Sequence, residues 1–281
     1  PQAIDTSAEN DRFFFQAIQK RSPGQRLQMA AVMMQNARRL SLCSLHQIFS
    51  DIEPETFAQK VALAWLQEDC PPHFRPVLNE MAWIQDSIGL AGLLQGILSA
   101  RKIPYYITGG VAAIAYGEPR TTRDLNLVLA LDRSDLPPLV TLLENAGFYV
   151  PGVADVQNGQ LNTLGITHQE SISRADLILA EFSAETDQTR LTFDRLKFQR
   201  IRVLDFPGVG LLPFASPEDL ILSKLLWGQQ SQSEKQWRDV LGILKVQGTQ
   251  LEWDYLRSWA DSLKLTELLD RALTATGIMG R

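Results

Sequence analysis

The chain has 281 residues, of which 45% are apolar and 21% are charged, as is ordinary for a globular protein with a sizeable core. Its formal net charge of −5 excludes a general attraction for polyanions, so a nucleic-acid partner would need a local basic patch. Two cysteines are too few for a disulfide scaffold, the three histidines show no zinc-site spacing, and we expect Cys43 and Cys70 to be buried thiols.

The N-terminal residues lack the basic-then-apolar order of a secretory signal. The most apolar segment, residues 88–100, is too short to span a bilayer. We therefore expect a cytoplasmic protein with no membrane partner.

Helical patterns fill the chain up to about residue 101. Residues 22–42 start with Ser22 as the expected N-cap and Pro23 at the first helical position. Residues 54–70 carry apolar side chains at helical spacing, and the consecutive prolines 71 and 72 indicate a linker. A further helix is predicted over residues 86–103.

The pattern changes at Tyr105. Short segments rich in strand-favouring residues, 104–108 and 125–131, flank a short helix at 110–116. A helix over 133–148 follows, with Ser134 as its expected N-cap and Gly147 at its end. Residues 164–169 and 175–182 predict two more strands, and 194–206 an edge strand or hairpin. Helical spacing returns with Ser216 as the cap and continues to the end of the chain.

Strands interleaved with helices, followed by a helical tail, predict an α/β or α+β protein. We place a helical module at residues 1–80, a core of strands and helices at 81–210, and a helical segment that packs on the core at 211–281.

The segment "DLNLVLAL", residues 124–131, has polar side chains at its start. Residues i and i+2 of a strand point to the same face, so Asp124 and Asn126 lie together, opposite the leucines. Oxygen-bearing side chains in this position suit a hard cation such as magnesium. Asp176 begins a second apolar segment and could reach the same cation if its strand lies beside the first. The alternative is an acid exposed to water at the start of a strand.

Gly109 and Gly110 stand between a predicted strand and a predicted helix. Glycines there let a phosphate approach the backbone, and the helix N-terminus supplies unpaired N–H groups. Thr108 adds a hydroxyl. The alternative is an ordinary tight turn.

Cationic side chains accompany these motifs. Arg120, Thr122 and Arg123 precede Asp124 in the sequence. The guanidinium group of an arginine fits phosphate oxygens, so these residues could bind a polyphosphate. The alternative is a solvated turn with an Arg–Asp pair. Lys224 and Asp239 lie on successive predicted helices. A lysine near a triphosphate neutralises charge as the leaving group departs, and the alternative is a solvated lysine that caps a helix end.

These motifs together resemble the nucleotidyltransferase superfamily, which has a polymerase-beta-like fold. Its pattern is Gly-Gly or Gly-Ser at a helix start, then Asp-x-Asp on the next strand, then a third acid on a neighbouring strand. Gly109 and Gly110 match the first part, Asp124 matches the first acid, and Asp176 matches the third. Asn126 stands at the second acid.

The form "GG…GxPRxTxDL" followed by "SPEDLI…K…RD" is closer still to one bacterial branch. That branch includes nucleotidyltransferase-like toxins of abortive-infection and toxin–antitoxin systems. The matching positions here are Arg120, Thr122, Lys224 and Asp239. The resemblance covers roughly residues 90–244 and leaves the first 80 residues outside.

The resemblance implies a mixed sheet flanked by helices, and a nucleoside triphosphate with Mg²⁺, or alternatively Mn²⁺. An acceptor hydroxyl attacks the α-phosphate and pyrophosphate leaves. Metal ligands would be Asp124, Asn126 and Asp176, with Lys224 completing the catalytic set. Nucleotide-binding residues would be Thr108, Gly109, Gly110, Arg120, Thr122, Arg123 and Asp239.

Asn126 departs from the family pattern because it offers a neutral oxygen in place of a carboxylate. At least one divalent ion should therefore bind weakly, since ligand charge sets affinity for hard cations. Three hypotheses stay open: a working nucleotidyltransferase, a nucleotide-binding or regulatory relative without turnover, and an interaction protein that acts through its N-terminal helices. The acceptor could be an RNA end such as that of a transfer RNA, a protein or a small molecule.

Overall fold

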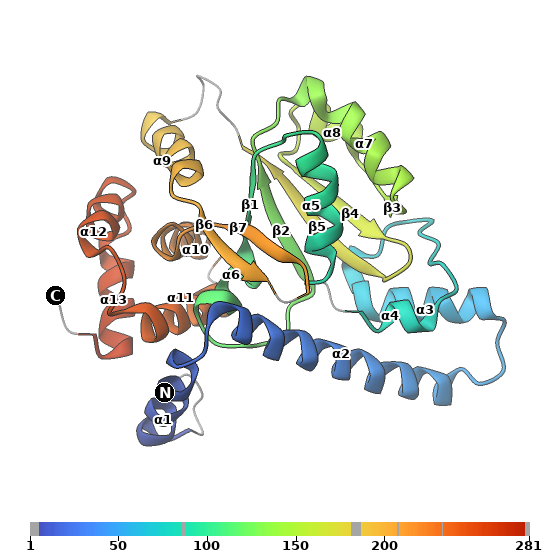
Figure 1. Cartoon of the computed structure of the whole chain (residues 1–281), viewed down its shortest axis with the longest axis horizontal. Coiled ribbons are helices and arrows are strands. Elements are labelled where there is room, and N and C mark those ends of the chain that lie inside the picture. The colour runs from blue at the N-terminus through green and yellow to red at the C-terminus, as the bar shows by residue number, and fades with distance from the viewer. Residues whose placement is uncertain (1–5, 86–87, 181–186, 207, 232, 279–281) are drawn as a thin grey trace. The chain divides into compact units, whose positions relative to one another are not determined.

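Seven strands form one mixed sheet in a computed structural model that describes residues 6–85, 88–180, 187–206, 208–231 and 233–278. Their order is β3 (Phe148–Tyr149), β4 (Thr163–His168), β5 (Ser173–Leu179), β2 (Asp124–Leu129), β1 (Tyr105–Thr108), β7 (Gly210–Phe214) and β6 (Arg202–Phe206). The pairs β2–β5 and β1–β7 are parallel, whereas β3–β4, β4–β5 and β6–β7 are antiparallel. Helices flank the sheet (Figure 1), which confirms the predicted α+β class.

The chain divides into two units by its internal contacts, and each is built from separate stretches of sequence. Unit 1 comprises Pro1–Met29, Tyr106–Arg120 and Glu181–Arg281, and unit 2 comprises Ala30–Tyr105 and Thr121–Ala180. The division of the chain into segments 1–80, 81–210 and 211–281, made from the sequence, stays a prediction.

Unit 2 contains β2 to β5 and the helices around them. The leucine face of β2 is buried, as alternation predicted, while Asp124, Asn126 and Val128 are only half-buried. The N-terminal helices share a core with the turn between β4 and β5, where Phe57 and Val61 pack in one cluster with Ile172. The helices of unit 2 are most of α2 (Pro23–Ile48), α3 (Pro54–Leu66), η1 (Gln67–Asp69), α4 (Glu80–Trp83), α5 (Leu90–Ala100), η2 (Arg133–Asp135), α7 (Leu136–Asn145) and α8 (Val153–Gln157).

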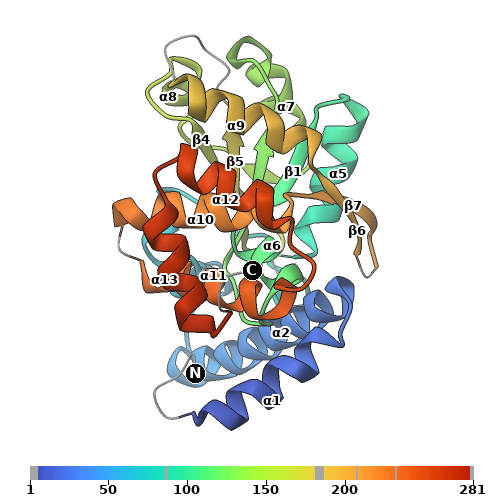
Figure 2. The same ribbon diagram turned by 90° about the vertical axis from the view of Figure 1, so that its left-hand side faces the viewer.

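Unit 1 is mostly helical. Its helices are α1 (Ala8–Gln19), the start of α2, α6 (Gly109–Tyr116), α9 (Gln188–Gln199), α10 (Pro217–Ser231), α11 (Glu234–Gln247), α12 (Trp253–Ser262) and α13 (Thr266–Thr276). Helices α10 to α13 gather in both views (Figures 1 and 2), and α11 also contacts α6 and α1. Phe15 and Ile18 of α1 pack with Val246 of α11, so the N-terminal helix belongs to the core of this unit.

Local signals placed several helix ends correctly. The Ser22 hydroxyl accepts from Gln25 N at 3.2 Å and Ser22 N donates to the Gln25 side chain at 2.9 Å, which is a capping box. The Ser216 hydroxyl caps α10 by accepting from Asp219 N at 3.1 Å. Ser134 is not an N-cap, because it lies inside η2 and α7 starts after Asp135.

Residues 194–206 were expected to form an edge strand or hairpin, and only their second half does so. The first half belongs to α9, whose N-cap Asp187 accepts from Arg190 N at 3.0 Å. The second half is β6, which pairs with the unpredicted strand β7. Predicted element ends at residues 86–87 and 181–182 lie outside the described residues.

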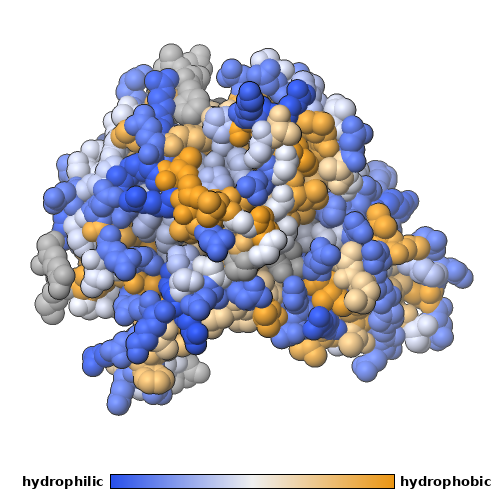
Figure 3. Space-filling model, in the orientation of Figure 1, coloured by the Kyte–Doolittle hydropathy of each residue, from blue (hydrophilic) through white to orange (hydrophobic). Residues whose placement is uncertain are grey.

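Two exposures differ from expectation. Cys43 is exposed and Cys70 is half-buried, so neither thiol is fully buried. Exposed apolar side chains gather over α2 to α4 (Figure 3), and Leu40, Ile48 and Met81 are 72%, 69% and 81% exposed.

No helix in the described part of the chain combines the length and hydropathy of a membrane span.

Candidate functional site

The half-buried face of unit 2 carries the predicted acids. Strand β5 lies beside β2 in parallel register, with Asn126 opposite Asp176 and Asp124 opposite Arg174. On the other side of β5, Gly165 of β4 is the register neighbour of Asp176. The structure therefore brings Asp124, Asn126 and Asp176 to one face of two neighbouring strands, as the sequence pattern required.

A second set of contacts on this face was not predicted. The Arg174 guanidinium donates to Asp176 Oδ1 from Nε at 3.2 Å and from Nη2 at 2.9 Å, and its Nη1 pairs with Asp69. Burial disfavours the guanidinium charge, but Asp176 and Asp69 outweigh it and raise the pKa of Arg174 above its ordinary value. The arginine is therefore a fixed positive charge beside the predicted metal ligands.

Arg123 and Thr122 lie at the entrance to β2. Arg123 donates to the Gln67 side chain at 2.7 Å and pairs with Glu68 at 3.3 Å, so residues of η1 engage it. Thr122 is buried, and its hydroxyl donates to the Asp124 carbonyl at 3.4 Å. These contacts hold the turn that presents Asp124.

Gly109 and Gly110 form the first turn of α6 in unit 1. Gly109 has φ +65°, a left-handed conformation that favours glycine, and Thr108 is the N-cap. The Thr108 side chain makes no capping hydrogen bond. The Gly-Gly pair thus leaves the backbone N–H groups of the helix start without a side-chain cap, as an anion site at a helix start requires.

Arg120, Lys224 and Asp239 form a buried ion cluster in unit 1. Arg120 donates to both Asp239 oxygens at 2.8 Å, and Lys224 Nζ donates to Asp239 Oδ2 at 2.7 Å and to the Gln236 side chain at 2.8 Å. The side chains of Lys224 and Asp239 are 5% and 4% exposed, so the predicted alternative of a solvated Lys224 is wrong.

Burial and charge act in opposite directions on Asp239 and on Lys224. Burial would raise the pKa of Asp239, but the Lys224 ammonium and the Arg120 guanidinium outweigh it and hold that pKa below its ordinary value. Burial lowers the pKa of Lys224, and the Asp239 charge opposes this shift. Two cations share one carboxylate, so the cluster carries a formal charge of +1.

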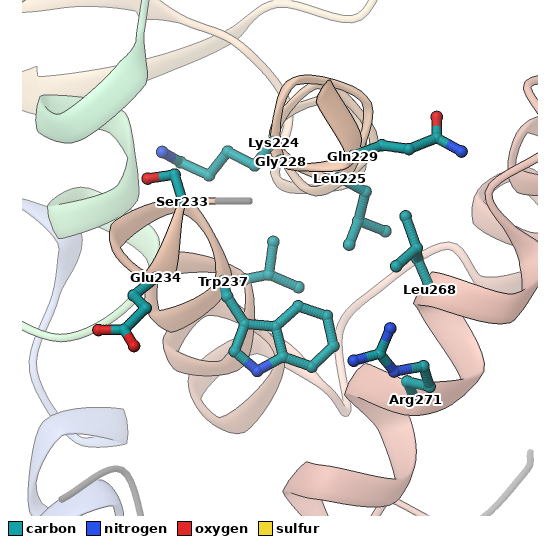
Figure 4. A pocket seen from close by; sticks show the side chains of 10 residues that line it. Lys224, Leu225, Gly228, Gln229, Ser233, Glu234, Trp237, Leu268 and Arg271 are labelled. Atoms are coloured by element: carbon teal, nitrogen blue, oxygen red, sulfur yellow. The ribbon is translucent and has the colours of Figure 1, made fainter. Parts of the chain in front are cut away.

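A pocket of about 510 Å³ lies beside this cluster between α10, α11 and α13 (Figure 4). Leu225, Leu268 and the Trp237 indole line it, and the Arg271 guanidinium lies over the indole ring, 5.5 Å from its centroid. The Lys224 ammonium points away from this indole (Figure 4). Trp237 is half-buried at this pocket.

The sequence-predicted residues thus fall into two sets that each unit holds by itself. Unit 2 holds Asp124, Asn126, Asp176, Thr122 and Arg123, and unit 1 holds Thr108, Gly109, Gly110, Arg120, Lys224 and Asp239. Among the described residues, no group of three or more His, Cys, Asp or Glu side chains is placed to hold a metal ion. The sequence analysis missed Arg174 and Asp69. Arg174 had a usable signal, because it precedes Asp176 by two positions on a strand and so shares its face.

No family model matches the chain, and no curated protein does. Among solved structures, it is similar to an antigenic nucleotidyltransferase-like protein from Paracoccidioides brasiliensis, with 21% identity, a TM-score of 0.44, and 68% of this chain and 93% of that one covered. It is also similar to ANT(2'')-Ia in complex with adenylyl-2''-tobramycin, with 15% identity, a TM-score of 0.44, and coverage of 63% and 96%. A third is the lincomycin-bound lincosamide antibiotic adenylyltransferase LnuA, with 14% identity, a TM-score of 0.39, and coverage of 55% and 94%.

Proposed function

We propose that this protein is a nucleotidyltransferase that binds a nucleoside triphosphate and transfers the nucleoside monophosphate to an acceptor hydroxyl. One observation carries the proposal. Asp124 and Asp176, which the motif order had marked as metal ligands, lie on one face of adjacent parallel strands, with Asn126 directly opposite Asp176. The pattern expects the third acid on a neighbouring strand, and the parallel register of β2 with β5 places Asp176 at the level of Asn126.

The ion cluster of unit 1 supports the same chemistry. Lys224 and Arg120 exceed Asp239 by one positive charge, and phosphate oxygens are the anions that such side chains recognise. We assign Asp239 the role of holding the two cations in place, since both donate to its carboxylate. Gly109 and Gly110 supply the backbone N–H groups of a helix start.

In the proposed reaction, an oxygen of the acceptor hydroxyl forms a bond to the α-phosphorus. The bond between that phosphorus and the oxygen bridging to the β-phosphate breaks, the hydroxyl proton is lost to solvent or a base, and pyrophosphate leaves. The family resemblance gives Lys224 the role of offsetting the charge that builds on the leaving group, and Arg120 lies with it in the same cluster of unit 1.

A magnesium ion, or manganese, would be held by the Asp124 and Asp176 carboxylates, with the Asn126 amide oxygen as a neutral donor. When bound, such an ion polarises a phosphoryl oxygen as a Lewis acid. Two carboxylates fit one ion that arrives with the nucleotide. They do not fit two resident ions, because Asn126 adds no charge and Asp176 already accepts from Arg174.

A second candidate function is nucleotide binding without turnover, as in a regulatory relative. The Arg174–Asp176 pair favours it, because this pair and Asn126 both reduce the negative charge available to a metal. The acceptor in the first function, an RNA end, a protein or a small molecule, would have no counterpart in the second.

Calorimetry separates these functions. The four nucleoside triphosphates are titrated into wild type and Asn126→Asp, with magnesium and with a chelator, and labelled triphosphate is then followed for transfer and pyrophosphate release. Magnesium-dependent binding of a nucleotide with release of pyrophosphate is expected for the transferase. Binding without release supports the second candidate. Absence of binding in both proteins contradicts both and favours an interaction protein acting through its N-terminal helices.

A further inference from the structure

Arg174 lies among the predicted metal ligands of unit 2. Two rows of register neighbours cross this face, Gly165–Asp176–Asn126 and Thr167–Arg174–Asp124. The Arg174 backbone thus lies level with Asp124, and the Arg174 side chain extends along β5 to the level of Asp176. Its guanidinium joins Asp176 on one side and Asp69 of η1 on the other.

The neighbouring strand leaves room for this guanidinium. A Cβ added at Gly165 would lie 3.2 Å from Arg174 Nη2 and 3.5 Å from Asp176 Oδ1. The position that faces Asp176 from β4 therefore has no side chain, and the Arg174 head group lies over it.

The charges of these side chains affect whether Asp176 can bind a metal ion. Asn126 is neutral, so Asp176 is the one charged side chain in its row, and the Arg174 guanidinium pairs with it as well as with Asp69. A divalent cation needs anionic oxygens, and Asp176 Oδ1 accepts from two guanidinium nitrogens. Arginine forks bind carboxylates more strongly than neutral donors do.

We propose that Arg174 is a built-in counter-ion for Asp176, which takes the place of a divalent cation and must leave before a metal ion can bind Asp176 Oδ1. Asp69 positions the guanidinium from η1, which lies outside the predicted core. The inference rests on the proposed function, since that function makes Asp124 and Asp176 metal ligands. It adds a way of controlling the site: whatever draws Arg174 away from Asp176 admits the metal.

The test titrates Mn²⁺ alone into the full-length chain and follows the loss of the free-ion electron paramagnetic resonance signal. Arg174→Gln is expected to bind Mn²⁺ at least about tenfold more tightly than wild type, because it removes the charge competing for Asp176. Gly165→Ala keeps the charge but forces Arg174 Nη2 to move, and a smaller gain is expected. Gly165→Ala also keeps the inference testable if Arg174→Gln does not fold.

Two controls locate the effect. Arg133→Gln removes the same charge from a residue of unit 2 that donates to the Leu161 carbonyl, and should leave Mn²⁺ affinity at the wild-type value. Arg174→Gln combined with Asp176→Asn should lose the gain. The inference is overturned if Arg174→Gln gains no affinity, if Arg133→Gln gains as much, or if the gain survives the loss of Asp176.

This test contains no nucleotide, so its result is separate from that of the proposed function. A chain that binds no nucleotide can still show the Mn²⁺ gain, which would remove only the proposed function. A chain that transfers nucleotides with no gain in Arg174→Gln would remove only the counter-ion role.

Discussion

Asp239 decides the electrostatic balance of unit 1. It is the acceptor for both Arg120 and Lys224, and its side chain is 4% exposed. Removing the charge of the carboxylate would leave the Lys224 and Arg120 cations without the anion that they share. The stability of the cluster therefore depends on the charge of this one residue.

Asp239→Asn is expected to lower the free energy of unfolding by about 3–5 kcal/mol near neutral pH, the usual cost of breaking a buried ion pair. The folded-state pKa of Asp239 lies below its ordinary value, so its stabilisation is fully present above the unfolded pKa of about 3.9 and is lost as pH falls through the folded value. Urea unfolding of wild type and Asp239→Asn across pH should show a difference in the free energy of unfolding that is constant near neutrality and becomes smaller below about pH 4. A gap of the same size at the most acidic pH would refute this account.

Lys224 is expected to contribute to nucleotide binding. Lys224→Met removes the charge while an unbranched apolar side chain fills similar space, and Arg120 still pairs with Asp239. Nucleotide affinity should fall about tenfold or more, since a charge-assisted contact to phosphate is lost. Calorimetry measures it, with Lys60→Ala as the control, because Lys60 is an exposed lysine of unit 2. Equal affinity in Lys224→Met and wild type would remove Lys224 from the site.

At the scale of elements, the contact between α6 and α11 depends on the absence of a side chain at Gly117. A Cβ there would lie 2.9 Å from the Ala113 carbonyl oxygen and 3.1 Å from both Gly242 C and Ile243 N, all backbone atoms. Helix α6 begins with the Gly-Gly pair, so the same packing fixes the direction of its N-terminus.

Gly117→Ala is expected to lower the free energy of unfolding by about 1–3 kcal/mol, as overpacking does when backbone atoms must shift. Gly96→Ala is the matched control, since it lies inside α5 with nothing within 4 Å of the added Cβ. That change should stabilise by about 0.5–1 kcal/mol because glycine is entropically costly in a helix. Chemical denaturation measures both, and a Gly117→Ala protein as stable as wild type would show that the packing of α6 on α11 tolerates a side chain at this position.

The elements also show what sequence can and cannot predict. The capping of α10 by Ser216 is local, and its pattern was sufficient. The Asp219 carboxylate of the same motif accepts from Tyr255, 36 positions away, at 2.6 Å, and the sequence gives no sign of this contact. The apolar–polar alternation around Leu196 and Phe198 favoured a strand, yet α9 forms there. Tertiary packing overrode the local pattern in that segment.

The candidate site also has a part that could be predicted from the sequence and a part that could not. The face shared by Asp124 and Asn126 follows from strand periodicity, and the pairing with Asp176 was a hypothesis that the register bears out. Asp69 could not be predicted, because it comes from a short turn 105 positions before Arg174 and joins the site only through folding. The burial of Lys224 was missed because a lysine on a helix is solvated far more often than not.

For the whole molecule, the order of the chain and the two units do not coincide. Residues 1–80 contribute to both units: Phe15 and Ile18 pack with Val246 in unit 1, and Phe57 and Val61 pack with Ile172 in unit 2. Arg38 adds hydrogen bonds to the carbonyls of Ser171 at 2.8 Å and Ile172 at 3.1 Å.

A fragment of residues 81–281 is therefore expected to lose cooperative folding. Each buried Phe, Ile or Val side chain contributes about 1.5–3 kcal/mol, so the four named above contribute about 6–12 kcal/mol, which is comparable to the 5–15 kcal/mol by which domains are typically stable. Near-ultraviolet circular dichroism and thermal melting compare the fragment with the full chain, and adding residues 1–80 as a separate polypeptide should restore the signal. A fragment that melts cooperatively within a few degrees of the full chain would show that residues 1–80 are a dispensable module. In that case the cores around Val246 and Ile172 would be complete without α1 and α3.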